Sequence, residues 1–92
     1  MLAIDLSRHA AGFLESLPAK QARQIAEKLQ SLTIAPQALP TEALKGYSSM
    51  RRLRAGEYRI IYVVDGQILQ VRVIGKRNDD EIYKALERGF KK

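Results

Sequence analysis

Cysteine is absent from this sequence of 92 residues, and histidine occurs once, as His9. The lack of cysteine excludes disulfides and thiolate metal sites, and it is compatible with a reducing compartment. No His, Asp or Glu cluster has the spacing of metal ligands, and His9 has no acidic residue at a suggestive distance. These patterns argue against a metal site and against a Ser–His triad. We therefore expect no metal and no cofactor.

Long hydrophobic runs and glycine-rich phosphate loops are also missing. No apolar run approaches the roughly 20 residues that span a bilayer, so we expect no membrane partner. The first residues, MLAIDLSRHAAGFL, have no basic lead and carry Asp5 early, so they are not expected to act as a signal peptide. We expect a cytoplasmic protein in which residues 1–92 form a single domain.

Positive charge is abundant, and it is unevenly distributed. The net charge is +6, and the whole excess lies in residues 45–92, which hold twelve cations and six anions. Residues 1–44 hold four of each. A one-sided basic surface attracts polyanions, nucleic acid first among them. The competing interpretation is solubility alone, because many small soluble proteins are equally basic.

The first half of the chain has the pattern of a strand followed by two helices. LAIDLS alternates apolar and polar residues, as a half-buried strand does. Ser7 can cap a helix over residues 8–16, and a second helix is predicted over residues 18–32, with apolar positions at helical spacing. The connector, residues 33–48, contains Pro36, Pro40 and Gly46, which deny it a long helix.

The second half has the pattern of a three-stranded meander. Its predicted strands are MRRLR, YRIIYVV and QILQVRVI, separated by turns at Gly56 and at Asp65–Gly66. A turn is expected at Gly75, and then a helix over residues 79–88. The fold class is therefore α+β. We expect a small antiparallel sheet formed by the N-terminal strand and the meander, a helical hairpin on one face, a short C-terminal helix, and a partly open second face.

Seven cations fall in the strand region: Arg51, Arg52, Arg54, Arg59, Arg72, Lys76 and Arg77. Strand side chains alternate between faces, so Arg52 and Arg54 should share one side and Arg51 the other. Arg59 interrupts an apolar strand. Because burying an unpaired charge is costly, it should face solvent or hold an anion. The planar guanidinium suits a phosphate particularly well.

Arginines with a nearby tyrosine can support RNA cleavage without a metal. In that reaction the 2′-hydroxyl attacks phosphorus, and guanidinium groups stabilise the charge that develops on the phosphate. Tyr83, six residues after Arg77, is the candidate tyrosine. The competing interpretations are a solvated strand edge for Arg51, Arg52 and Arg54, and simple packing for Tyr83.

The stretch LKGYSSMRRLRAGEYRIIYVVDGQILQVRVIGKRNDDEIYKAL, residues 44–86, resembles the RelE/ParE superfamily of toxins from toxin–antitoxin systems. The resemblance rests on the Leu-Lys-Gly lead, the strand ending in RLR, the pattern G-x-Y-R-x-x-Y, and the final GKR followed by a tyrosine. It implies a type II toxin. RelE-like members are endoribonucleases that cut mRNA in the ribosomal A site, whereas ParE-like members inhibit DNA gyrase.

The RelE-like branch implies a role for each matching residue. Arg59 and Arg77 would hold the phosphate, Tyr83 would act on the 2′-hydroxyl, and Arg52 would act on the leaving-group side or on the transition state. Further RNA contacts are expected from other basic residues of this region: Lys45, Arg51, Arg54 and Lys76. The presence of Arg77 and Tyr83 favours the RelE-like branch.

Two positions depart from the pattern of some RelE members, which carry lysines at alternating positions of the first meander strand. Here those positions hold Met50 and Arg52. Methionine has no charge, and an arginine is effectively never neutral, so Arg52 is a poor proton donor and should mainly stabilise charge. The phosphate-binding roles do not depend on this difference.

The resemblance also implies a partner, a cognate antitoxin that neutralises the toxin in a hetero-oligomer. An acidic antitoxin would suit the basic half. Apolar surface near Phe13 and Leu29 could form its groove, or these residues could belong to the core. Two alternatives to a ribonuclease stay open: a ParE-like gyrase inhibitor, and a catalytically inactive module that only binds the antitoxin.

Overall fold

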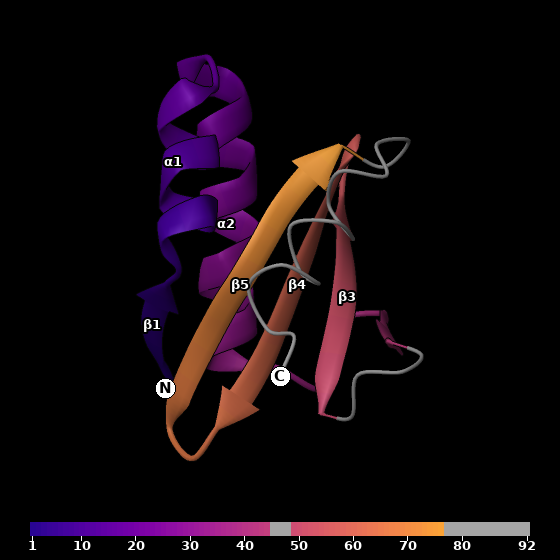
Figure 1. Ribbon diagram of the computed structural model, residues 1–92. Helices are drawn as coiled ribbons and strands as arrows, with labels where there is room; N and C mark the ends of the chain where they lie inside the picture. Colours follow the sequence, from indigo (N-terminus) through magenta and orange to yellow (C-terminus); the bar gives the residue numbers. More distant parts are fainter. Residues whose placement is uncertain (45–48, 77–92) are drawn as a thin grey trace.

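The computed structural model of the protein describes residues 1–44 and 49–76 (Figure 1). The described chain forms two helices and a five-stranded sheet whose strand order is β1-β5-β4-β3-β2. Both helices lie on the same side of the sheet (Figure 1), which confirms the α+β class and the helical hairpin on one face. The elements are β1 Ala3–Leu6, α1 Arg8–Ser16, α2 Ala19–Ile34, β2 Thr41–Ala43, β3 Met50–Ala55, β4 Tyr58–Asp65 and β5 Ile68–Lys76.

The two helices begin as the sequence predicts. The Ser7 hydroxyl accepts a hydrogen bond from the Ala10 amide at 3.1 Å and so caps α1. The same hydroxyl donates to the carbonyl of Arg72, which ties the start of α1 to β5. Helix α2 starts after Pro18, without a side-chain cap, and runs two residues beyond its expected end. Among the described residues, no helix is long and apolar enough to cross a membrane.

Three strands of the meander lie where they were expected, joined by turns in which Gly56 and Gly66 have φ of 63° and 62°. The left-handed conformation is inexpensive only for glycine, which explains why these two positions make the turns. The N-terminal strand does join the edge of the meander. However, β1 runs parallel to β5, with Ala3 opposite Ile68, so the sheet is mixed rather than antiparallel throughout.

Two features of the sheet were not expected. Within the connector, β2 pairs antiparallel with β3 and forms the second edge of the sheet. In addition, the chain does not turn at Gly75, because this residue lies inside β5 and pairs with Arg59 of β4. Earlier in β5 the register shifts: Ile61 pairs with Val73 but Tyr62 pairs with Val71, which leaves Arg72 as an extra residue in the strand.

The hydrophobic core lies between the helices and one face of the sheet. It contains residues from α1, α2 and strands β3 to β5: Ala10, Ile25, Leu29, Leu32, Leu53, Ala55, Tyr58, Ile60, Tyr62, Leu69, Val71 and Ile74. Leu29 is 3% exposed, and half-buried Phe13 packs edge-on against Tyr58 with ring centroids 5.8 Å apart. Of the two interpretations of Phe13 and Leu29, the structure therefore supports a place in the core rather than an open groove.

Candidate functional site

The pairing of β3 with β4 decides which arginines share a face. Arg54 lies directly opposite Arg59, and Arg52 lies opposite Ile61, so all three arginines project from the side of the sheet away from the core. We call this side, defined by Arg52, Arg54 and Arg59, the arginine face. Arg51 lies opposite Tyr62, a core residue, and therefore belongs to the helix-covered face. The expected alternation along β3 is confirmed.

Arg59 has an environment that suits an anion. Its cross-strand neighbours are Arg54 on β3 and Gly75 on β5, so one neighbour is a cation and the other has no side chain. The residue is only partly exposed, and its buried Nε atom has no hydrogen-bond partner among residues 1–44 and 49–76. A buried donor that lacks a partner is unfavourable unless a ligand supplies one. An oxyanion above Gly75 would supply both charge and acceptor atoms.

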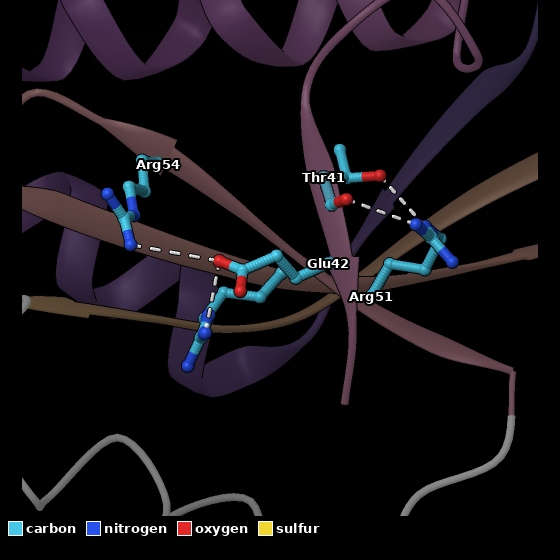
Figure 2. Close-up of polar contacts among 5 residues, drawn as sticks. Thr41, Glu42, Arg51 and Arg54 are labelled. Carbon is cyan, nitrogen blue, oxygen red and sulfur yellow. Dashed lines mark hydrogen bonds and ion pairs between the residues drawn. The ribbon is translucent and has the colours of Figure 1, made fainter. Parts of the chain in front are cut away.

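Glu42 of β2 is a member of this site that sequence reasoning missed. It pairs with Arg52 across the sheet, and its Oε1 atom lies 3.1 Å from Nη2 of Arg52 and 3.8 Å from Nη2 of Arg54. Figure 2 shows its carboxylate pointing toward the arginines, between two guanidinium groups. The hydrogen bond and charge of Arg52, followed by the charges of Arg54 and Arg59, lower the pKa of the Glu42 carboxyl.

Arg51 is held on the other side of the sheet edge. Its Nε donates to Thr41 Oγ1 at 2.8 Å and its Nη2 donates to the Thr41 carbonyl at 3.1 Å (Figure 2). It lines a cavity of about 530 Å³ together with Thr41, Tyr62, Val64 and residues of the connector. The structure therefore does not bring Arg51 together with the arginine face, and its RNA contact stays a prediction.

The remaining predicted site residues fall into two groups. Lys76 is exposed at the end of β5, opposite Tyr58. Lys45, Arg77 and Tyr83 lie outside the described residues, so their roles also stay predictions. Within residues 1–44 and 49–76, no three His, Cys, Asp or Glu side chains come close enough together to hold a metal ion. What this part of the chain offers chemically is a group of guanidinium donors for an oxyanion.

A mixed sheet with helices on one face and arginines on the other defines a class of small α+β proteins with a basic sheet surface. Residues 4–81 match the model of a family described as the ParE toxin of the type II toxin–antitoxin system, parDE. Because this match spans most of the chain, the protein belongs to that family. It is a toxin of a type II toxin–antitoxin system in the RelE/ParE superfamily.

Solved structures with the same fold come from RelE toxins. A variant of the E. coli toxin RelE in the free state is 23% identical, with a TM-score of 0.77 over 97% of this chain and 98% of that one. RelE in the intact E. coli RelBE toxin–antitoxin complex is 22% identical, with a TM-score of 0.70 over 86% and 100%. A chain of the RelB–RelE complex from Methanococcus jannaschii is 24% identical, with a TM-score of 0.64 over 91% of this chain and 96% of that one. None of the curated proteins matches the chain.

Proposed function

We propose that this toxin is a metal-independent endoribonuclease that cleaves mRNA on the ribosome and thereby inhibits translation. The observation that carries the proposal is the arginine face, where Arg54 and Arg59 lie side by side and a buried donor of Arg59 has no partner within the described part of the chain. A phosphate group would accept hydrogen bonds from these guanidinium groups. It would also be stabilised by their charge as cleavage proceeds.

In the proposed reaction, the 2′-oxygen of one nucleotide attacks the adjacent phosphorus, and the bond from phosphorus to the 5′-oxygen breaks. The products are a 2′,3′-cyclic phosphate and a free 5′-hydroxyl. Arg59 and Arg77 hold the phosphate, and Tyr83 acts on the 2′-hydroxyl that loses its proton. The proton gained by the 5′-oxygen can come from water. Further contacts to the RNA are proposed for Lys45, Arg51, Arg54 and Lys76.

Arg52 stabilises charge in this scheme and does not donate the proton. A guanidinium group keeps its proton over the whole accessible pH range, so it carries positive charge throughout the reaction. In the chain without RNA, its Nη2 atom lies 3.1 Å from the Glu42 carboxylate, on the arginine face. A positive charge in this place stabilises the transition state more than the ground state, because the transition state carries extra negative charge.

The dependence on the ribosome follows from the weak acid–base chemistry of these residues. Arginine does not titrate near neutral pH, and an ordinary tyrosine has a pKa of about 10. Without a group poised near pH 7, proton transfer contributes little, and the rate depends on how well the RNA is positioned. The ribosome would supply that positioning in its A site. A cytoplasmic location goes with this substrate.

A cognate antitoxin is the second proposed partner. In the intact E. coli RelBE complex and in the RelB–RelE complex from M. jannaschii, the toxin is bound to its antitoxin. In the present chain the whole excess of positive charge lies in residues 45–92. An acidic antitoxin segment would be attracted to this half of the protein and would compete there with RNA. We infer a toxin–antitoxin hetero-oligomer as the neutralised form.

A gyrase inhibitor is the alternative that one observation favours, because the matching family model is that of the ParE toxin. A gyrase inhibitor would cause DNA damage and leave mRNA intact. A module that has lost toxicity would bind the antitoxin and have no effect on growth. The three functions are therefore separable by what happens to mRNA, to DNA and to growth.

The test is primer extension on a reporter mRNA in a cell-free translation reaction, with the wild-type protein and with Tyr83→Phe. Discrete cuts within translated codons that disappear in the variant would support a ribosome-dependent endoribonuclease. Omitting ribosomes should abolish the cuts. Intact mRNA with inhibited DNA supercoiling would establish the gyrase alternative instead.

Growth arrest in cells gives an independent test. Arg77→Ala and Tyr83→Phe should each relieve the arrest while the circular dichroism spectrum and melting temperature stay close to those of the wild type. Undiminished toxicity in both variants would contradict the ribonuclease assignment. Retained binding to a cognate antitoxin serves as the control for correct folding.

A further inference from the structure

Glu42 lies where an anionic ligand of the arginine face would bind. Its Oε1 atom is 3.1 Å from Nη2 of Arg52 and 3.8 Å from Nη2 of Arg54. Carboxylate and phosphate oxygens accept the same charge-assisted hydrogen bonds from a guanidinium group. The carboxylate of Glu42 therefore makes, within the chain, the contacts that a bound phosphate would make.

The fold itself does not require a carboxylate at this position. Strand β2 is held to β3 by backbone pairing, with Glu42 opposite Arg52, and the side chain of Glu42 is 56% exposed. Exposed ion pairs contribute little to stability because water and salt screen them. The larger consequence of Glu42 is electrostatic, since it offsets part of the charge of the three neighbouring arginines.

We propose that Glu42 is an internal counter-ion of the anion site, which an RNA phosphate must displace. Its presence weakens the binding of free RNA, so that the site is filled effectively only by RNA that a larger partner holds in place. The inference rests on the proposed function in taking the ligand to be RNA. The competition between carboxylate and phosphate for Arg52 and Arg54 does not depend on cleavage.

Binding to a short fluorescent RNA tests the proposal. The probe is a 2′-O-methylated oligonucleotide, which lacks the attacking hydroxyl and cannot be cleaved, and affinity is measured by fluorescence anisotropy. Glu42→Gln and Glu42→Ala should both bind about two- to fivefold more tightly, the factor that corresponds to one exposed ion pair. The difference should shrink at about 1 M salt, where the screening length is roughly 3 Å.

The matched control is Glu15→Gln, which makes the same change of net charge on an exposed residue of α1, in the helical layer. It should bind the probe like the wild type. Equal tightening in Glu15→Gln and Glu42→Gln would overturn the proposal, because net charge alone would then explain both. Unchanged binding in Glu42→Gln with weakened binding in Glu42→Ala would also overturn it, and would show that Glu42 only orients Arg52.

The outcome is separable from that of the proposed function. Tighter binding by the Glu42 variants supports the counter-ion even if the wild type leaves ribosome-bound mRNA intact, in which case only the ribonuclease proposal fails. Cleavage of mRNA by the wild type without tighter binding by the variants overturns the counter-ion alone. A DNA oligonucleotide of the same length should show the same tightening, because the contacts are to phosphate.

Discussion

The two faces of the sheet differ in chemistry although the same strands build both. On the helix-covered face, Leu53, Ile60 and Tyr62 are at most 2% exposed and pack against α1 and α2. On the arginine face, alternate positions of the same two strands carry Arg52, Arg54 and Arg59. One face therefore supplies the stability of the fold, and the other is free to carry charge at little cost to it.

The arginine face also carries two buried apolar residues, so the division into an apolar face and a charged face is incomplete. Ile61 and Val73 lie opposite each other on the side of the arginine face, and both are buried, at 0% and 1% exposure. Their aliphatic side chains lie beside Arg52, which is opposite Ile61. A less polar surrounding strengthens the attraction between a guanidinium group and an anion.

The largest difference between the two faces should be in stability, and it should come from a cavity on the helix-covered face. Ile60→Ala removes a fully buried side chain, and such a change typically costs about 2–5 kcal/mol because a cavity remains. Arg54→Ala, on the exposed arginine face, should change stability by less than about 0.5 kcal/mol. Urea denaturation of both variants measures the difference, and similar losses in the two would contradict the division of roles.

The next largest effect should be a loss of mRNA cleavage without a loss of stability, on the arginine face. Arg59→Met keeps much of the aliphatic length and removes the charge, so mRNA cleavage should fall by about 10²- to 10³-fold, as when a donor to a transition state is lost. Stability should be unchanged or higher, because none of the described residues accepts a hydrogen bond from the buried Nε atom of Arg59. Cleavage rates and urea midpoints of the same preparations provide the check. A large loss of stability would show that Arg59 is a structural residue.

A smaller effect is expected where the helical layer meets the sheet. Ser7→Ala removes the cap of α1 and the hydrogen bond to the carbonyl of Arg72, and loss of a cap costs about 0.5–2 kcal/mol. Ser7→Asp restores an acceptor for the Ala10 amide but cannot donate to the carbonyl. The stability of Ser7→Asp should therefore lie between that of the wild type and that of Ser7→Ala. The melting temperatures of the three proteins, followed by circular dichroism, distinguish the contribution of the helix cap from that of the hydrogen bond to β5.

The smallest effect should be a change of stability with pH, which arises from the titration of Glu42. Its pKa lies below the ordinary value of 4.5, because folding favours the charged carboxylate beside Arg52, Arg54 and Arg59. A lowered pKa means that the stabilisation is present above about pH 4.5 and is lost as the pH falls through the folded-state pKa. The melting temperatures of wild type and Glu42→Gln should differ slightly at pH 7 and converge once the pH lies below the folded-state pKa of Glu42. A difference that persists in acid would contradict this origin.

Part of the candidate site could be predicted from the sequence. The alternation of strand side chains predicts that Arg52 and Arg54 share a face, and the cost of an unpaired charge in an apolar strand singles out Arg59. The meeting of Arg54 and Arg59 could not be predicted, because it depends on the register between β3 and β4. Arg77, Tyr83 and Lys45 stay predictions.

Glu42 was missed and Gly75 was misplaced for the same reason. A three-residue strand such as β2 is too short to show a periodic pattern, so nothing in the connector indicated that Glu42 would reach the arginines. Glycine usually signals a turn, but Gly75 lies within β5, opposite Arg59. In both cases the position is determined by a partner strand distant in the sequence.

The sequence by itself determined the helices, the meander and the glycine turns, because periodicity, caps and left-handed φ angles are properties of a few neighbouring residues. It also determined that Arg52 and Arg54 would share one face of β3. Tertiary structure decided the parallel pairing of β1 with β5, the extra residue at Arg72, and the contact of Glu42 with Arg52 and Arg54. These features join segments far apart in the chain, and their energies depend on packing that no local pattern records.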